Sequence, residues 1–448
     1  METSVQRLRY VLQVLEPAVG GKKATLPILQ NVVVGESRAY ALNLETAVTV
    51  EFPEAPDAPL LLPHQQLQRL LRHIPAATRL SINREGPVLK LAAGATSAEF
   101  PVPAEASEFP PLPKLQPVHE GQVDGDLFLK TATALAPYAA TDGSRPALQC
   151  VCVTLGAPLE MAAADGFRLA WQTIPMALPA LGSPPIALKQ LLLPTTAVAT
   201  LARVWKVMEK HPTVDGQSAA NGSDPLKKDG GFRLARLAVA KRMATIRFTR
   251  TALTFHHGAL TIWVQLTQSD FPNYHQLIPS DLPNKVSFDA EEALRAVRSL
   301  AEAAADGSGM VRLNWAGDHL MLSARAEEAG TTASTIRAHI QGEEGRIAFD
   351  IKYLTAYLAG KLGMVMLETS TPETSARFYH AGSPDLVLMP MFVGDPAAPT
   401  TEPAADQPAD ATTDGAGGAG AAATAEGPDP EPAPAAAKPR ARARRAKS

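Results

Sequence analysis

The sequence repeats one plan along its first 393 residues, and this repetition constrains the fold more than any other feature. An apolar run that ends in proline, Leu60–Pro63, leads into a helical pattern, and Leu191–Pro194 does the same. Proline suits the first turn of a helix, because its missing N–H would have no partner there. Pro27–Val32 likewise has a counterpart at Pro146–Val151. Repeats of this length indicate copies of one structural unit that pack side by side.

Each repeat reads as a helix, short strands, a second helix and short strands again. Between the helical patterns, apolar and polar residues alternate, which is typical of half-buried antiparallel strands. The predicted leading helices are Val5–Leu15, Leu127–Tyr138 and Ala290–Ala304, and the second helices are Gln66–Ile74, Ala197–Met208 and Ile351–Lys361. The sequence therefore predicts an α+β protein of three repeated domains, each with two helices against antiparallel sheets. We place these domains at residues 1–118, 119–284 and 285–393, with a polar insertion at about 211–231 in the second.

The composition agrees with several domains and argues against simple electrostatic capture of nucleic acid. A chain of 448 residues is too long for one ordinary core. It has no run of about 20 apolar residues that would span a membrane, and its N-terminus lacks the pattern of a signal peptide. The net charge is −3, so any positive surface for DNA must be sorted onto one face. We expect a cytoplasmic protein.

The cysteines and histidines give no sign of a metal or a catalytic centre. Cys150 and Cys152 alternate along one predicted strand, too close together for an ordinary disulfide. Because there are no further cysteines, we expect neither structural zinc nor a cofactor. His256 and His257 are adjacent on a strand, so their side chains diverge, unlike ligands aimed at one metal. No phosphate-cradling loop stands out either, so an enzyme is the disfavoured alternative.

The last part of the chain differs from the rest in composition. From about Gly394 it consists mainly of Ala, Pro, Gly, Thr and Asp. A segment with so little to bury is predicted to be disordered. It ends in a basic stretch, Lys438–Lys447, which carries six positive charges. This stretch fits a weak, salt-sensitive contact with nucleic acid, and a solubilising tail without a partner fits equally well.

Four segments, in the same order along the chain, resemble one protein family. Gly20–Val32 is similar to the N-terminal signature of bacterial β sliding clamps, and Ala164–Ala170 looks like their Thr-Asp-Gly-His-Arg-Leu-Ala segment. Phe271–Pro279 resembles their Phe-Pro-Asp-Tyr-Arg-Arg-Val-Leu-Pro segment, and Val387–Met391 resembles the last residues of the clamp. On these segments the chain is identified as a member of the β subunit family of DNA polymerase III.

The resemblance implies both a fold and a function. Clamp subunits have three domains of like topology, and two chains close head-to-tail into a homodimeric ring whose helices line the hole. The ring is a non-catalytic processivity factor that encircles duplex DNA without reading its sequence. It tethers DNA polymerase III α, clamp-loader subunits, and other polymerases and repair proteins, which places it at the nucleoid. The alternative within the family is a paralogue that acts as a resistance copy or a decoy.

Basic residues recur on the predicted helices of all three repeats, at spacings that put them on one helical face. A solvated basic face would explain any single stripe, but recurrence favours a lining of the central hole. The stripes are Arg69 with Arg72, Arg203 with Lys206 and Lys210, and Arg295 with Arg298. The resemblance places Lys22, Lys23, Arg72 and Arg145 where clamps touch the duplex.

Clamps bind short partner peptides in one apolar groove between the second and third domains, and the resemblance carries this groove over position by position. Two methionines around a proline would give it a polarizable, adaptable lining. The alternative is that Val387–Met391 is only an ordinary last strand. The matching residues are Leu148, Gly166, Phe167, Arg168, Leu169, Pro272, Gln276, Leu277, Ser375, Val387, Leu388, Met389, Pro390 and Met391.

The chain departs from the family at several positions that bear on function. Phe167 stands in place of the usual histidine, Ala164 in place of threonine and Gln276 in place of a frequent arginine, so the groove is predicted to be more apolar. The resemblance puts Pro101 and Pro103 on the edge strand that pairs across the subunit boundary. Residues two apart direct their N–H groups to the same side, so that side lacks two donors. Either the ladder uses the other side, or side chains hold most of the ring together.

Overall fold

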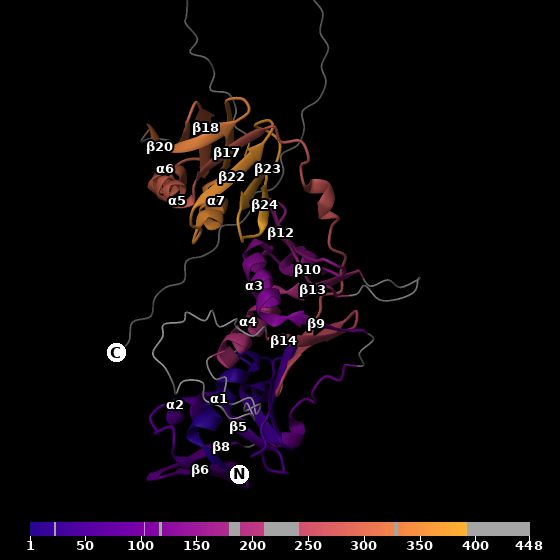
Figure 1. The fold of residues 1–448 in the computed structure, drawn as a ribbon. Coiled ribbons are helices and arrows are strands. Elements are labelled where there is room, and N and C mark those ends of the chain that lie inside the picture. Colours follow the sequence, from indigo (N-terminus) through magenta and orange to yellow (C-terminus); the bar gives the residue numbers. More distant parts are fainter. Residues whose placement is uncertain are drawn as a thin grey trace, which may run out of the picture. The chain divides into compact units, whose positions relative to one another are not determined.

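The computed structural model of the chain describes most of the three repeats (Figure 1). The described residues are 1–21, 24–102, 104–115, 119–178, 189–209, 242–326 and 330–391. Several sequence predictions lie outside them, namely those for Lys22, Lys23, Pro103, Lys210, the polar insertion at 211–231 and the C-terminal tail.

Within the described residues, the same order of elements occurs three times: one strand, a helix, four strands, a second helix and three strands. The first copy is β1 (Glu2–Ser4), α1 (Val5–Leu15), β2 (Asn31–Gly35), β3 (Arg38–Leu42), β4 (Thr46–Glu51), β5 (Leu60–Pro63), α2 (His64–Leu71), β6 (Arg79–Glu85), β7 (Val88–Ala93) and β8 (Thr96–Pro101). The second is β9 (His119–Asp124), α3 (Gly125–Leu135), β10 (Cys150–Thr154), β11 (Leu159–Ala164), β12 (Arg168–Ile174), β13 (Gln190–Pro194), α4 (Thr195–Glu209), β14 (Met243–Phe248), β15 (Ala252–His257) and β16 (Leu260–Gln265). The third is β17 (Asn284–Asp289), α5 (Ala290–Ser299), α6 (Ala301–Ala305), β18 (Met310–Ala316), β19 (His319–Ala326), β20 (Gly330–Gln341), β21 (Gly345–Asp350), α7 (Ile351–Leu358), β22 (Met364–Thr369), β23 (Ala376–His380) and β24 (Asp385–Leu388).

Each leading helix begins directly after a strand, at a residue whose side-chain oxygen caps it. Ser4 Oγ accepts from the N–H of Arg7 at 3.2 Å, and Asp124 Oδ1 accepts from the N–H of Leu127 at 3.1 Å. Asp289 Oδ1 accepts from two N–H groups in the first turn of α5, at 3.0 and 2.9 Å. Such a cap contributes about 1 kcal/mol, so the corner between strand and helix is fixed at the same place in every repeat.

The predicted helices are present, and several of them differ in extent. α3 ends at Leu135 and passes into a 3₁₀ turn that reaches Tyr138, and α7 ends at Leu358 instead of Lys361. The single helix predicted for Ala290–Ala304 is divided into α5 and α6, because the backbone leaves ideal helical geometry at Leu300, where φ is −93° and ψ is −3°. α2 ends at Leu71 instead of Ile74. The guanidinium of Arg9 on α1 donates to the carbonyl oxygens of both residues, so these groups are satisfied without a further helical turn.

The strands form three antiparallel sheets, and two of them run from one repeat into the next. The orders are β1-β6-β7-β8, then β5-β2-β3-β4-β16-β15-β14-β9, and finally β13-β10-β11-β12-β24-β23-β22-β17-β20-β19-β18-β21. The second sheet is joined at β4 and β16, in a register from Val50↔Leu260 to Thr46↔Val264. The third is joined at β12 and β24. Each repeat is therefore tied to its neighbour by backbone hydrogen bonds.

The two joints between repeats follow one rule. Each pairs the last strands of two three-stranded runs: β2-β3-β4 meets β14-β15-β16, and β10-β11-β12 meets β22-β23-β24. At the first joint, helix α1 also packs against α4. Two such runs remain, β6-β7-β8 and β18-β19-β20. Among the described residues, the outer edge of β8 and that of β20 from Gly330 to Arg337 have no partner strand.

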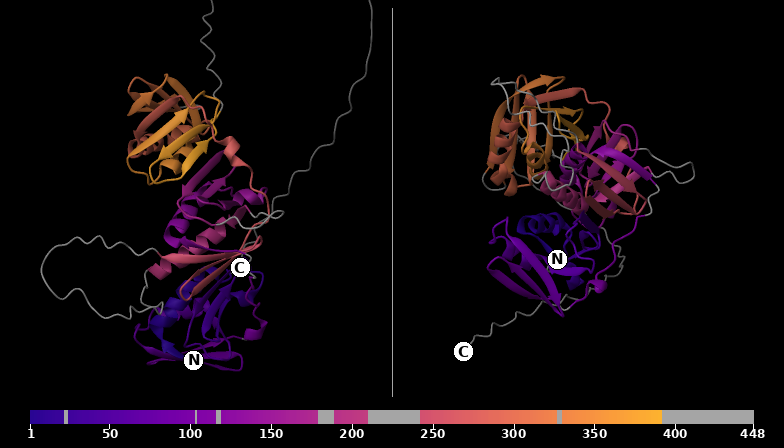
Figure 2. Two further views of the ribbon diagram at one scale, coloured as in Figure 1. Left: turned by 45° about the vertical axis from the view of Figure 1, so that its right-hand side comes forward. Right: turned by 60° about the horizontal axis from the view of Figure 1, so that its bottom comes forward.

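In each repeat the two main helices pack against each other on one face of the strands (Figures 1 and 2), and the main core lies between these layers. A second, smaller buried cluster lies on the opposite face of the largest sheet. There Cys150, Leu169 and Val387 are covered by Phe271 and Tyr274, which come from the loop before β17. None of the helices in the described ranges is both long and apolar enough to cross a membrane.

Candidate partner-binding groove and basic surface

The surface that the sequence predicts as the groove lies over a buried apolar floor, which is formed by this second cluster. Leu148, Leu169 and Val387 are at most 6% exposed, and they pack with Phe271 and Tyr274. β12 and β24 place Leu169 and Val387 directly opposite each other across the joint. The structure therefore brings residues of the second and third repeats onto one continuous surface.

Three large apolar side chains around this floor are open to solvent. Phe167, Leu277 and Met389 are 61%, 60% and 51% exposed. The N–H of Met389 donates to the carbonyl of Phe167 at 2.9 Å, and the N–H of Met391 donates to the carbonyl of Ala348 at 2.8 Å. The segment from Met389 to Met391 is thus held by one backbone bond to the turn before β12 and by another to β21. Apolar side chains gathered in the open on a fixed backbone indicate a surface that docks a partner.

The turn that carries Phe167 is fixed by Asp165 and Gly166. Asp165 Oδ1 accepts from the N–H groups of Phe167 and Arg168, both at 3.0 Å. Gly166 has a φ of +98°, and a Cβ there would lie 2.9 Å from Nη1 of Arg145. That guanidinium donates to the carbonyl of Asp165 at 3.3 Å. Only glycine fits this position without strain, and Arg145, a predicted DNA contact, lies against the same turn.

Arg168, a predicted groove residue, lies at the contact between the second and third repeats. Its Nε donates to Asp165 Oδ2 at 2.8 Å, and Nη2 donates to the carbonyl of Pro137 at 2.7 Å. The guanidinium lies over the rings of Tyr138 and Tyr353, 5.2 and 4.7 Å from their centroids. Each such cation–π contact contributes about 0.5–1 kcal/mol or more. Arg168 therefore fastens α7 to β12 and forms the base of the groove at this end.

The sequence analysis missed two aromatic residues of this site, Tyr138 and Tyr353. The ring of Phe167 stacks on that of Tyr353, with centroids 6.4 Å apart and planes inclined by 29°. Asp350 caps α7 by accepting from the N–H of Lys352 at 2.7 Å, which fixes where Tyr353 leaves the helix. This cap is visible in the sequence, but nothing there says that α7 meets β12.

The remaining predicted groove residues fall into two groups. Pro272, Gln276, Ser375, Pro390 and Met391 are exposed or half-buried. Leu388 is fully buried in the core on the helix side of β24, whereas Val387 belongs to the groove floor. Because neighbouring residues of a strand point to opposite faces, Leu388 supports this wall from behind and does not line it.

Tyr274 anchors the loop that carries Leu277. Its hydroxyl donates to Glu160, and Nε2 of His275 lies 3.1 Å from the same carboxylate oxygen. Burial, with a further contribution from Glu160, raises the pKa of Tyr274, so this phenol stays a neutral donor. Burial also raises the pKa of nearby Cys152 to about 12, and both cysteines are buried free thiols. Across the described ranges, no three His, Cys, Asp or Glu side chains gather as metal ligands.

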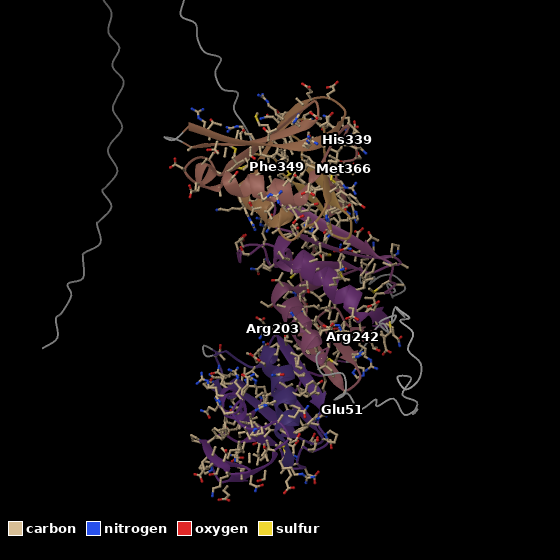
Figure 3. The ribbon with its side chains drawn as sticks, turned by 60° about the vertical axis from the view of Figure 1, so that its left-hand side comes forward. Glu51, Arg203, Arg242, His339, Phe349 and Met366 are labelled. Carbon is tan, nitrogen blue, oxygen red and sulfur yellow. The ribbon has the colours of Figure 1, made fainter. Side chains whose placement is uncertain are left out.

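The predicted DNA contacts are exposed but differ in their surroundings. Arg203 on α4 forms an ion pair with Glu16, at the end of α1, at 3.7 Å (Figure 3). Arg295 lines a polar cleft between α5 and β20 together with Glu292 and Arg337. The other described members are Arg69 and Arg72 at α2, Lys206 on α4 and Arg298 on α5. The helices of all three repeats therefore present basic groups to solvent.

Comparisons with known proteins agree with this architecture. The family model of the DNA polymerase III beta subunit, C-terminal domain, matches residues 275–370. The beta sliding clamp of Caulobacter vibrioides is 24% identical over 387 residues, which covers 83% of this chain and 91% of the relative. A beta sliding clamp homolog of Streptomyces muensis, GriR, is 23% identical over 347 residues, with 74% of this chain and 80% of the relative covered.

Solved structures share the fold. The DNA polymerase III subunit beta of Pseudomonas aeruginosa matches with a TM-score of 0.73 at 18% identity, covering 88% of this chain and 100% of that one. The subunit from Thermotoga maritima matches with a TM-score of 0.71 at 19% identity, covering 88% and 99%. Three like repeats joined edge to edge, with exposed apolar side chains at the second joint, define a DNA-clamp fold. The chain is similar over most of its length to β subunits of bacterial DNA polymerase III, which are non-catalytic processivity factors, and the family model of their C-terminal domain matches residues 275–370. The family and fold predicted from the sequence are confirmed.

Proposed function

We propose that two copies of this chain close head-to-tail around duplex DNA and tether the replicative polymerase through the groove. The observation that carries this proposal is the pattern of joints and free edges. Among the strands that the structure describes, each chain has two complete joints between repeats, and the last strands of two further runs, β8 and β20, have an open outer edge. A second copy supplies the missing partner for each of these strands, so in the closed pair every three-stranded run is joined to another.

The internal joints supply the geometry of closure. Both pair last strands in antiparallel fashion, so β8 of one chain should pair with β20 of the other in the same way. On β20, Ala338 donates to Asp318 at 2.9 Å on the side of β19. Because the N–H groups alternate along an antiparallel strand, those of Thr331, Ala333 and Thr335 point to the open edge.

The edge of β8 has fewer donors. Val102 donates to the carbonyl of Pro87 at 2.7 Å on the side of β7, so the alternation turns Ser97, Glu99 and Pro101 toward the open edge. Pro101 has no N–H to offer there. The sequence left two possibilities: either the ladder between chains uses the other side of this strand, or side chains hold most of the ring together. The structure favours the second possibility, because β7 already occupies the other side of β8. Side chains must therefore hold much of the ring joint together.

One such contact follows from the equivalence of the repeats. Arg72 and Arg203 stand at the same distance after the Leu-Leu-Leu-Pro segment that precedes each second helix. At the internal joint, Arg203 pairs with Glu16 at the end of the leading helix. In the third repeat, exposed Glu302 lies at the corresponding end of the leading helix. We therefore expect Arg72 of one chain to pair with Glu302 of the other.

Duplex DNA would pass through the ring, against the basic groups of the helices. Arg69, Lys206 and Arg298 suit a test, because none of them takes part in the expected joint contacts. Changing all three to Glu should weaken contact with duplex DNA and leave the dimer mass unchanged. Each lost phosphate contact should also reduce the log–log salt slope by about 0.9. If the slope stays the same, these residues do not face the DNA.

The decisive test of the function is retention on circular DNA. A closed ring should stay on a nicked circle at high salt and leave when the circle is cut, because only the topology holds it. Contact by charge alone would be lost at high salt on both forms. Dissociation from the intact circle at high salt, after loading by the clamp loader of the same bacterium, would disprove encirclement.

The groove is proposed to bind peptides of DNA polymerase III α, clamp-loader subunits and repair proteins. Leu277 and Met391 flank its floor, and burying one large apolar side chain contributes about 1.5–3 kcal/mol. The double change Leu277→Ala with Met391→Ala should therefore abolish binding of a polymerase peptide in a titration, with the dimer mass unchanged. Equal binding by wild type and the double variant would place the partner site elsewhere.

A second candidate function is that of a resistance copy, favoured by the more apolar rim at Phe167. The sliding clamps of Pseudomonas aeruginosa and Bartonella birtlesii have been solved with griselimycin bound. Griselimycin titrated into this chain separates the two functions. A resistance copy should bind it at least tenfold more weakly than it binds a polymerase peptide, and Phe167→His should restore binding. A replicative clamp should bind both.

A further inference from the structure

We propose that a partner held in the groove makes a second, apolar contact farther along the same sheet face. The contact surface is a patch on the third repeat, formed by Leu362, Met364, Met366 and Tyr379. This inference rests on the proposed function, because it needs a polypeptide anchored in the groove. The patch lies beyond the groove, and none of the residues assigned to the groove belongs to it.

The patch is unusually apolar for an exposed surface. Leu362, Met364 and Tyr379 are 71%, 58% and 43% exposed, and Met366 is half-buried. β22 presents Met364 and Met366 on one face, and β23 places Tyr379 directly opposite Met366. The residues between them point into the core on the helix side. Figure 3 shows Met366 on the third repeat near His339, its neighbour two strands away. Grouped apolar side chains of this kind indicate a docking surface.

The patch is continuous with the groove floor. Leu169 and Trp171 lie on the groove face of β12, where half-buried Trp171 packs against the groove cluster. Trp171 is opposite Asp385 on β24, and the register of β24 with β23 then puts Tyr379 beside Asp385. From the floor, the path therefore runs over Trp171, crosses the ion-paired Asp385 on β24 and reaches Tyr379 and β22. From β12 to β22 it spans three strand spacings, roughly 14 Å.

The charged groups along this path are paired with one another. Arg377 forms ion pairs with Asp385 and with Glu368, the latter at 3.9 Å, and its guanidinium lies 5.5 Å from the centroid of Trp171. Lys285 pairs with Glu368 at 3.3 Å. Charges that are already neutralised offer little to a charged ligand. The chemistry of the path therefore selects an apolar partner.

The occupant that fits is an extended segment continuing from the groove-bound peptide. An extended chain covers about 3.3 Å per residue, so an apolar side chain about four residues from the groove anchor would reach the patch. Methionine side chains adapt to differently shaped apolar groups, so the segment needs hydrophobicity at that point but no fixed sequence. Long partner segments should thus bind more tightly than the groove peptide alone.

The test compares two probes: the intact DNA polymerase III α subunit of the same bacterium and the shortest peptide from it that still binds. Both are titrated against wild type, Met364→Ser, Tyr379→Ser and the control Met321→Ser. Met321 is 40% exposed on β19, outside the patch. The patch variants should bind the intact subunit about tenfold more weakly and the short peptide within twofold of wild type. The control should match wild type with both probes, and all variants should keep the melting temperature.

Three results would overturn the inference. If both patch variants bind the intact subunit like wild type while the short peptide still binds, the patch is not a partner contact and the proposed function stands. If no polymerase peptide binds wild type, the groove assignment is wrong and the inference falls with it. If Met364→Ser changes the mass of the assembly in light scattering but not the affinity for the subunit, the patch is covered by another copy of the chain.

Discussion

The joint between β4 and β16 and the open edge of β8 are equivalent strand edges with different chemistry. At the internal joint, Glu51 donates to Ala259 at 3.0 Å, and the alternation turns Thr49 toward β16 as well. On β8, the residue that would donate next to Glu99 is Pro101. A ring that encloses circular DNA must open somewhere. The expected joint between chains is therefore weaker than the joints within a chain, because it has fewer backbone N–H donors.

The largest effect is expected from breaking the internal joint. Thr49→Pro removes an N–H from the ladder between β4 and β16 and should lower the free energy of unfolding by about 3 kcal/mol. Thr49→Val keeps the N–H and is the matched control. Denaturant unfolding of both variants measures the difference. A proline variant as stable as the valine variant would show that this joint does not depend on its backbone bonds.

The same substitution on β8 should act on the ring and not on the fold. Glu99→Pro removes an N–H that points away from β7. Because the ring has two such joints, a loss of about 1 kcal/mol at each should raise the dimer Kd roughly thirtyfold. Sedimentation of a dilution series measures this, with Glu99→Val as control. At a concentration where wild type and Glu99→Pro are both monomeric, the two proteins should have the same melting temperature. An unchanged Kd would mean that β8 is not the edge used.

Restoring the missing N–H donor at position 101 should lower the dimer Kd, by a smaller factor than Glu99→Pro raises it. Pro101→Ala gives the open edge one more N–H and should tighten the dimer up to about tenfold, because the new bond is partly offset by lost rigidity. The same dilution series reads this out. Weaker dimerisation of the alanine variant would indicate that the proline ring itself packs against the partner.

The smallest effect is expected at the ion pair proposed for the joint. Exposed pairs contribute about 0.2–1 kcal/mol each, so Arg72→Glu should weaken the dimer only a few-fold, and more at low salt. Adding Glu302→Arg should recover the loss, whereas adding Glu291→Arg, on the same helix region, should not. If Glu302→Arg and Glu291→Arg restore the dimer equally well, the effect comes from net charge alone, and Arg72 does not pair specifically with Glu302.

The order of helices and strands along the chain could be predicted from the sequence. The strand-to-helix corners repeat, and the apolar period changes from strand to helix at each of them. Parts of the site that lie within one short segment were also predictable. An example is the turn at Asp165 and Gly166, whose hydrogen bonds join residues two or three positions apart. In both cases the deciding interactions lie within a few residues of each other along the chain.

The rest depended on contacts between distant segments. The sequence analysis predicted Leu388 as a groove residue together with its neighbours. Only every second residue of a strand faces a given surface, and the pairing register decides which residues these are. Arg168 was predicted as a peptide contact, and the rings that hold it come from two other elements, at Tyr138 and Tyr353. Which way the N–H of a residue such as Glu99 points likewise required the pairing of β7 with β8.

Pro101 also has a consequence for a chain on its own. A single chain has an unpaired strand edge on its first repeat and another on its third repeat. Head-to-tail contacts between such edges give a closed ring only when the rotation from one copy to the next closes on itself. Any other rotation gives an open filament. An unpaired edge strand with all its donors would accept almost any extended chain in the cell. With a proline in place, a backbone ladder alone binds weakly, and only a copy that also matches the side chains can add to the edge. In the proposed ring, the residue that weakens the joint would therefore also protect the open chain from growing into fibres.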